Sequence, residues 1–388
     1  MVFNMKAAGI LATATAVSAS VLQLPVVIEN SYASVEFLVG TPPEPYRLLF
    51  DTGSASAWFT STSCTAESCP SLGSYKRNHY SVNSSSTSTD LHAFSGIDYI
   101  AGDGIAGAAI RDVFSTPDGS LEWNQTFLAA NESSWRWITA DGFLGLGFSS
   151  IAQNATTLVE TLLWDGKLDE PRFGLFYGTN LKDTGDQNGV LTIGGSEEEK
   201  YVDGEVVYTP LRKEKPYELW RGPLRSTGQQ PVTTDAEGVS PSANVTWEMW
   251  GFGSAVFDTG AGRVSIPDEI IDPVYFNLGW NLTKLLNGEE SMDCQHMNAS
   301  WAITFTMGEG EDHTKDVSFS MRGDEFLKAG DQCMPPFDNS GNTQFALIGA
   351  AFLRRWYTVF DFGADKVEDY QPRIGFGRLK KEWDYLSH

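Results

Sequence analysis

The chain has 388 residues, of which 41% are hydrophobic and 12% aromatic, so it is long enough for one large or two medium globular domains with a sizeable core. It carries 27 Lys and Arg against 50 Asp and Glu, a formal net charge of −23. This balance argues against nucleic acid as a partner, because phosphate binding needs clustered basic residues; it favours solubility, or adaptation to acidic surroundings, as the reason for the acidity.

Residues 1–20 are predicted to be a secretory signal peptide. Lys6 is followed by a weakly apolar run and then by small residues that offer a cleavage site before Val21. That run is too short to span a membrane, and no other stretch is long enough. The polar residues 379–388 give no signal for a lipid anchor. We therefore expect a secreted, extracellular protein without a membrane anchor.

Short runs rich in β-branched and aromatic residues dominate the rest of the chain, separated by Gly, Pro and Asn. They predict strands that include 34–39, 46–50, 190–193, 204–210 and 358–362. Few segments suit helices, namely 156–163, 268–278 and 323–329. The Ser-, Gly- and Pro-rich stretch 226–244 is interpreted as a surface loop. The pattern predicts a mostly β protein with sandwich- or barrel-like lobes.

Two further patterns agree with export. Seven Asn-x-Ser/Thr sequons predict a glycosylated surface, at Asn83, Asn124, Asn131, Asn154, Asn244, Asn281 and Asn298. Four cysteines allow two disulfides in three pairings, and sequence proximity favours Cys64–Cys69 and Cys294–Cys333. No CxxC or HExxH string occurs in the sequence, so we expect no metal site.

An internal repeat is the most informative feature. The string FDTG at 50–53 returns at 257–260, each time after an apolar run. In each half an apolar run with a glycine, Gly145 or Gly349, follows the aspartate after about ninety residues. The repeat predicts two similar lobes, residues 21–195 and 196–388, with a flexible break near Gly194.

Two such turns give paired carboxylates. We expect Asp51 and Asp258 to face each other, so that the two do not ionise together and one keeps a proton. One carboxylate can then take a proton from a water that attacks a carbonyl, while the other donates to the carbonyl oxygen. We expect Gly53 and Gly260 to present backbone N–H groups, and the threonine after each aspartate, Thr52 or Thr259, to brace the turn.

Several sequence motifs together resemble those of the pepsin-like aspartic proteases, and the overall character of the sequence is closest to that of secreted fungal members. They cover most of the chain, from about Val21 to Leu379: GTPP at 40–43, Trp58, the Cys64 and Cys69 pair, DGFLGLG at 141–147 and FLRRWYTVFD at 352–361. The resemblance implies a bilobal, almost wholly β fold with a cleft that holds an extended peptide. It also implies an endopeptidase that needs no cofactor and acts as a monomer, with a preference for apolar residues beside the cut.

The resemblance further implies a hairpin flap over the cleft. Tyr99 is similar to the flap tyrosine, with Gly102 and Asp103 as substrate-binding neighbours, and Trp58 is expected to hydrogen-bond the Tyr99 hydroxyl. Ser54 is expected to hydrogen-bond Asp51. The flap also contains a GxGxxG string at 102–107, but no βαβ unit surrounds it, which disfavours a nucleotide site. The aromatic pair at 135 and 137 is expected to be packed or partly exposed rather than to bind substrate.

The sequence departs from the family pattern near the second motif and at the N-terminus. Only about a dozen residues separate the predicted cleavage site from the first matched strand, so we expect no long basic pro-segment. Ala261 and Gly262 follow the second motif where many members of the family carry Ser or Thr, and Arg263 is unusual at the next position. Ala350 stands where an aspartate commonly follows the late glycine. These changes leave two alternatives open, a binding or inhibitor protein on the same fold and a non-proteolytic enzyme acting on a small molecule. The absence of a GxSxG string disfavours a Ser-His-Asp hydrolase.

Overall fold

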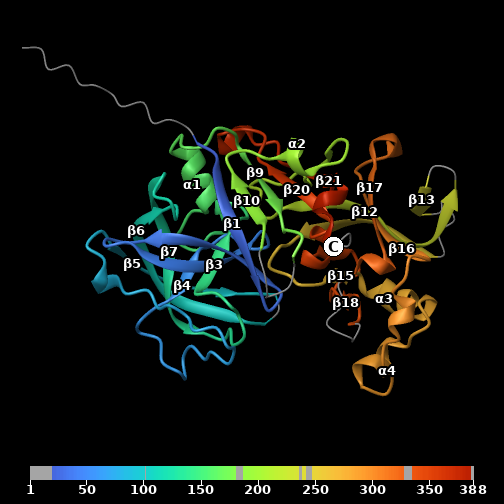
Figure 1. Ribbon diagram of the computed structural model, residues 1–388, viewed down its shortest axis with the longest axis horizontal. Coiled ribbons are helices and arrows are strands. Elements are labelled where there is room, and N and C mark those ends of the chain that lie inside the picture. The colour runs from blue at the N-terminus through green and yellow to red at the C-terminus, as the bar shows by residue number, and fades with distance from the viewer. Residues whose placement is uncertain are drawn as a thin grey trace, which may run out of the picture.

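The computed structural model describes residues 20–100, 102–180, 187–235, 238–241, 247–326 and 334–385. Strands dominate both halves of the molecule (Figure 1). The predicted mostly β, bilobal fold is confirmed. Residues 1–19, which carry most of the predicted signal peptide, lie outside the described residues.

Most strands of the larger sheet come from the first half of the chain. Their bounds are β1 (Leu22–Glu29), β2 (Tyr32–Val39), β3 (Glu44–Asp51), β4 (Trp58–Thr60), β5 (Thr89–Asp98), β6 (Gly104–Ser115), β7 (Glu122–Ser133), β8 (Gly142–Gly145), β9 (Arg172–Phe176), β10 (Gly189–Ile193), β11 (Val207–Pro210), β20 (Trp356–Asp361) and β21 (Arg373–Arg378). Among the described residues these form a 13-stranded sheet in the order β11-β21-β20-β9-β10-β1-β2-β3-β8-β4-β7-β6-β5.

The smaller sheet belongs to the second half. It contains β12 (Arg221–Asp235), β13 (Gly238–Pro241), β14 (Trp247–Phe257), β15 (Val264–Ile266), β16 (Trp301–Met307), β17 (Val317–Arg322), β18 (Phe337–Asn339) and β19 (Phe345–Ile348). The order is β17-β16-β12-β14-β19-β15-β18, with β13 paired to β12. The helices are α1 (Leu158–Trp164), α2 (Glu198–Tyr201), α3 (Asp268–Asn277), α4 (Leu282–Leu286) and α5 (Ala350–Leu353).

The two halves repeat one arrangement of four strands. In the first, β3 pairs in parallel with β8, β8 with β4 antiparallel, and β4 with β7 in parallel. In the second, β14, β19, β15 and β18 follow each other with the same directions. Each aspartate therefore lies at the end of a strand that is held beside a parallel strand, and the later glycine lies at the end of that second strand.

Alternating burial explains why the half-exposed strands form. In β1 the side chains of Leu22, Leu24, Val26 and Ile28 are buried while those between them are more exposed. This period of two is the signature of a strand with one face on the core. By contrast, residues 48–51 at the end of β3 are all buried, because neighbouring strands and packing cover both faces of this segment.

Strands from the end of the chain join the first half. β20 pairs with β9, and β21 and β11 continue the same sheet, as the red strands beside β9 and β10 show in Figure 1. The division between residues 195 and 196 stays a prediction. The crossing of late strands into the first sheet means that the two halves share one sheet and one continuous buried core.

Two expectations about local structure are wrong. The stretch 226–244 was expected to be a loop, but its part 226–235 belongs to β12, which pairs with β14 on one side and β16 on the other. Backbone pairing on both sides outweighs the low strand propensity of its Gly and Pro residues. The helix expected at 323–329 is only a 3₁₀ turn, Gly323–Glu325, and residues 327–329 lie outside the described part.

The predicted export features can be placed in part. Cys64 and Cys69 are joined by a disulfide. Cys294 is also disulfide-bonded, and its predicted partner Cys333 lies outside the described residues. Of the sequons, Asn131 is half-buried and Asn244 lies outside the described residues; the exposed ones are Asn83, Asn124, Asn154, Asn281 and Asn298. Within the described ranges, no helix combines the length and the apolar character needed to cross a membrane.

Candidate active site

Both motif aspartates lie where an apolar strand ends. Asp51 is the last residue of β3, and Asp258 follows β14 directly. In each turn the N–H two residues later donates to the carboxylate: Gly53 N lies 2.8 Å from Asp51 Oδ1, and Gly260 N lies 2.8 Å from Asp258 Oδ1. The two turns therefore hold their carboxylates in the same way.

Reciprocal hydrogen bonds between the two threonines join the turns. The Thr52 hydroxyl donates to the Phe257 carbonyl at 2.7 Å and accepts from Thr259 N–H at 3.0 Å. The Thr259 hydroxyl donates to the Phe50 carbonyl and accepts from Thr52 N–H, both at 3.0 Å. All these groups are buried, and a buried backbone group left without a partner costs about 1–3 kcal/mol. The exchange thus fixes the position of one turn against the other.

The glycines of the two motifs bring the carboxylates together. A Cβ atom built on Gly53 would lie 2.4 Å from Asp258 Cγ, and one built on Gly260 would lie 2.5 Å from Asp51 Oδ1. Each glycine therefore lies against the opposite aspartate, with no room for a side chain. This close approach is the direct structural sign that Asp51 and Asp258 form one pair.

The pair is not symmetric in its side-chain donors. The Ser54 hydroxyl donates to Asp51 Oδ2 at 2.5 Å. The matching position after the second motif is Ala261, which offers only its backbone N–H, 3.1 Å from Asp258 Oδ1. Asp51 thus accepts one hydroxyl bond that Asp258 lacks.

The electrostatic environment, like the donors, favours a proton on Asp258 rather than on Asp51. Burial raises the pKa of the Asp258 carboxyl well above its ordinary value, and the charge of Asp51 and a hydrogen bond with it raise that pKa further. The N–H groups of Gly260 and Ala261 oppose this shift only in part. When the pair carries a single negative charge, Asp258 is therefore the member that keeps the proton.

A hairpin made by β5 and β6 covers the pair. Tyr99 begins the turn between these strands, where its N–H donates to the Asp103 carbonyl at 2.8 Å and Gly102, at φ 90°, donates to the Tyr99 carbonyl. Trp58 Nε1 donates to the Tyr99 hydroxyl at 2.8 Å, the contact that the resemblance implied. Burial, and then the charge of Asp51, raises the pKa of the Tyr99 hydroxyl, which therefore stays neutral.

A cleft of ≈730 Å³ lies between this hairpin and the two carboxylates. Both halves of the chain line it, mostly with apolar side chains, including Ile97, Phe143, Leu219, Val256, Phe345 and Leu347. Gly102 and Asp103 are not among the described residues that line it, and the Asp103 carboxylate instead accepts a hydrogen bond from Ser134 at 2.8 Å. The structure therefore does not bring these two predicted substrate-binding residues to the cleft.

A second arm of ≈510 Å³ continues the cleft and shares several lining residues with the first, among them Trp135 and Gly260. It contains the positions that departed from the family pattern, Ala261, Gly262, Arg263 and Ala350. Arg263 forms an ion pair with Asp338 at 3.0 Å. The departures thus shape one arm of the cleft and leave the contacts between the two turns intact.

Trp135 is a cleft residue that the sequence did not identify. It lines both arms and packs edge-on against Tyr99, with ring centroids 5.3 Å apart. Trp137, two positions later, is 56% exposed. The only signal in the sequence was the aromatic pair itself, and nothing in its spacing separates a cleft residue from a packed one. Arg221, which also lines the cleft, was missed because it lies in a strand that was not expected.

Among the described residues, no group of three His, Cys, Asp or Glu side chains is placed to hold a metal ion. The site consists instead of two buried carboxyls, their backbone donors and a covering tyrosine. The model of the eukaryotic aspartyl protease family matches residues 31–369, which include both aspartate turns and the hairpin. The chain belongs to this family. As a member of the eukaryotic aspartyl proteases it is an aspartic-type endopeptidase, a hydrolase.

Curated proteins similar to this chain are also named as proteases of this kind. A probable vacuolar protease A of Trichophyton verrucosum is 27% identical over 346 residues, 87% of this chain and 78% of that protein. Gastricsin of Rattus norvegicus is 24% identical over 351 residues, 90% and 83% of the two chains. Pepsin A of Rhinolophus ferrumequinum is 26% identical over 350 residues, 88% and 82%. The similarity extends over both lobes, as the resemblance predicted.

Proposed function

We propose that Asp51 and Asp258 together activate a water molecule that attacks a peptide carbonyl of an extended substrate. Asp51, ionised, accepts a proton from the water while the water oxygen bonds to the carbonyl carbon. Asp258 gives its proton to the carbonyl oxygen, so that a neutral diol forms. The proton held by Asp51 then passes to the amide nitrogen, one hydroxyl of the diol returns a proton to Asp258, and the C–N bond breaks; this leaves a carboxylic acid, an amine and the pair in its starting protonation state. The single observation that carries this assignment is the asymmetry of the pair: Ser54 donates to Asp51, while burial raises the pKa of Asp258.

The remaining site residues support this chemistry by position. Thr52 and Thr259 fix the two turns against each other, and Gly53 and Gly260 give the carboxyls room to meet. Tyr99, held by Trp58, closes over the substrate as a lid. The apolar lining of the cleft supports the expected preference for apolar residues beside the cut bond. A binding protein has no need of this paired arrangement, which therefore favours an enzyme. An enzyme acting on a small molecule would use the same pair, and the match to the eukaryotic aspartyl protease family supports proteolysis over that alternative.

Peptide cleavage tests the proposal directly. The purified protein is incubated with a mixed peptide library between about pH 3 and pH 7, with and without pepstatin, beside an Asp51→Asn variant and an Asp103→Asn control. We expect cleavage that pepstatin and Asp51→Asn abolish and that Asp103→Asn retains, because the Asp103 carboxylate accepts from Ser134 rather than lining the cleft. A protein that folds and cleaves no peptide at any pH would refute the proposal.

We further propose that the protein enters the secretory pathway, is glycosylated, and acts outside the cell as a monomer. The signal-like residues 1–20 and the sequons support export. Several relatives are named vacuolar proteases, and the vacuole is therefore the alternative destination. Expression of the full chain in a fungal host, with assay of the medium and of isolated vacuoles, separates the two. Activity confined to the vacuole would overturn the extracellular assignment.

A further inference from the structure

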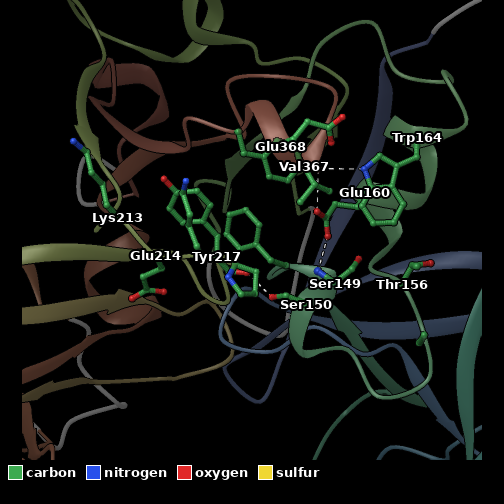
Figure 2. Close-up of a pocket in the computed structure, with 15 residues that line it drawn as sticks. Ser149, Ser150, Thr156, Glu160, Trp164, Lys213, Glu214, Tyr217, Val367 and Glu368 are labelled. Carbon is green, nitrogen blue, oxygen red and sulfur yellow. Dashed lines mark hydrogen bonds between the residues drawn. The ribbon is translucent and has the colours of Figure 1, made fainter.

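A second large cavity lies beside the active-site cleft. It encloses ≈1100 Å³, more than the ≈730 Å³ of the arm above the aspartates. Three segments line it, within 148–164, 213–217 and 367–370, and Figure 2 shows their side chains gathered around it. The catalytic proposal uses none of these residues.

Aromatic side chains form one part of the cavity surface, and charged residues form another, namely Lys213, Glu214, Lys215 and Glu368. The rings of Tyr217 and Tyr370 pack against Phe148, with centroids 5.8 Å and 6.2 Å from it. At the edge, Trp164 is 44% exposed and Val367 is 49% exposed. Covering the exposed apolar surface of Trp164 and Val367 with an apolar group lowers the free energy, because that surface leaves water.

The polar atoms at its base are already paired. The Glu160 side chain, only 2% exposed, accepts from the Tyr370 hydroxyl at 2.9 Å and from Ser149 N–H at 2.5 Å. Trp164 Nε1 donates to the same tyrosine oxygen at 3.3 Å. Because these hydrogen bonds are made within the protein, the base offers a fixed shape rather than unmet donors. The base therefore favours an apolar group, while Lys213, Lys215 and Glu368 bring charge to other parts of the lining.

Two chain segments run directly from this cavity into the cleft. In the 3₁₀ turn Ser149–Ile151 the first two residues line the cavity and Ile151 lines the cleft. In the segment before β12, Tyr217 lines the cavity and Leu219 the cleft. Consecutive Cα atoms are about 3.8 Å apart, so the two hollows are neighbours. A peptide that leaves the cleft on this side reaches the cavity within a few residues.

We propose that the cavity is an exosite that takes a large apolar side chain, aromatic by preference, from the protein substrate beyond the part held in the cleft. The identity of the occupant rests on the proposed function. The occupant is a substrate segment because neighbouring residues of the same two chain segments line the cleft and the cavity, and an apolar one because Trp164 and Val367 expose apolar surface at the edge. Short peptides that fill only the cleft do not use this site, whereas longer chains do.

The test uses nested peptides. A peptide of about eight residues around a cleaved bond is compared with versions extended on either side, each carrying one Phe or one Ser at successive positions. Two matched variants are made at exposed valines: Val367→Asp at the cavity rim, and Val207→Asp, 47% exposed on β11 and lining neither hollow.

We expect Phe at one extension position to raise kcat/KM about tenfold over Ser, mainly through KM, because a large apolar side chain leaves water. Val367→Asp should abolish this gain and leave cleavage of the short peptide unchanged, and Val207→Asp should keep both. The exosite is refuted if no position of Phe gives a gain, or if both variants lose it equally.

Binding distinguishes failure of the exosite from failure of the proposed function. If the short peptide is not cleaved, the same Phe and Ser peptides are titrated into the Asp51→Asn protein. A Kd about tenfold lower for Phe, lost on adding Val367→Asp, still supports the exosite. A blocked single phenylalanine that binds as tightly as the Phe peptide would instead make the cavity a small-molecule site. Self-association removed by Val367→Asp would assign it to a second copy of the chain.

Discussion

The two aspartate turns share their backbone and differ in their side chains. Each carboxylate accepts an N–H at 2.8 Å from the glycine two residues later, and each threonine donates to a carbonyl of the opposite half. Yet Ser54 donates a hydroxyl bond to the first carboxylate, and Ala261 offers only an N–H to the second. The repeated backbone determines where the two groups meet, while burial, the charge of Asp51 and the unequal donors together determine which of them keeps the proton.

The largest effect should follow from removing either acid. Asp51→Asn and Asp258→Asn are each expected to lower kcat by about 10³–10⁴-fold or more, because neither amide can exchange the proton that the reaction moves. Both variants should fold, since an asparagine oxygen can still accept the glycine N–H. Steady-state kinetics with Asp103→Asn as the control measures this. Either variant retaining a tenth of the wild-type rate would show that the pair is not the acid–base unit.

The second comparison concerns the glycines. Gly53→Ala and Gly260→Ala should each lower kcat/KM about 100-fold and destabilise the fold by about 1–3 kcal/mol, because the new methyl would lie on the opposite carboxylate. Gly262→Ala is the matched control, as no atom lies within 4 Å of the added Cβ. Steady-state kinetics and urea unfolding of the three variants measure kcat/KM and the free energy of unfolding and so test this prediction. If all three variants lost activity and stability equally, the close approach of each glycine to the opposite carboxylate could not be the cause of the losses.

The threonines should behave alike despite the asymmetry around them. Thr52→Val and Thr259→Val each leave one buried carbonyl and one buried N–H without a partner, so each should lower the free energy of unfolding by about 2–4 kcal/mol. Thr306→Val removes an exposed hydroxyl contact with Ser318 and should cost less than about 0.5 kcal/mol. Unfolding curves that differ strongly between the two buried variants would contradict the reciprocal arrangement.

The smallest expected effect is a change in the pH dependence of the rate, and this change should differ between the two aspartate turns. Ser54→Ala removes a donor to the Asp51 carboxylate, which disfavours the ionised form, so the acidic limb of the pH–rate profile should move up by about one unit. Ala261→Ser adds a donor near Asp258, whose pKa burial raises, and should move the alkaline limb down by a similar amount.

A pH–rate profile of each single variant and of the double exchange checks this assignment. The double exchange should show both shifts together, because the two hydroxyls act on different carboxyls. If Ala261→Ser moves only the acidic limb, Asp258 is not the member that keeps the proton, and the roles of the two aspartates in the proposed reaction are reversed.

Much of the site could be predicted because its signals are local. An apolar run, an aspartate and a glycine in immediate succession specify a strand that ends in a tight turn, and the second copy at matching spacing specifies a second lobe. Tyr99 and Trp58 were found through the resemblance to the pepsin-like proteases, since either residue alone would be read as an ordinary strand or core residue. The disulfide between Cys64 and Cys69 follows from their short separation.

What the sequence missed depends on pairing between distant segments. The composition of 226–235 favours a loop, but β14 and β16 pair with its first part, as far as residues 229 and 231, and β13 pairs with residues 232–235. Trp135 lines the cleft because the hairpin residue Tyr99 and Phe143 on β8 pack against it, with ring centroids 5.3 Å and 4.9 Å away. Neither contact has a counterpart in local spacing.

The sequence by itself determined that this protein has two lobes, each delivering one carboxylate on a glycine turn, because strand, turn and repeat are encoded in adjacent residues. Ser54 and Ala261 already differ in the sequence, but only the tertiary structure decided which of those carboxylates keeps the proton. The pKa of Asp258 depends on burial and on the charge of Asp51, a residue more than two hundred positions earlier in the chain. The cavity beside the cleft likewise exists only because three distant segments meet there. Such properties arise from desolvation and packing across the fold, which no local stretch of sequence contains.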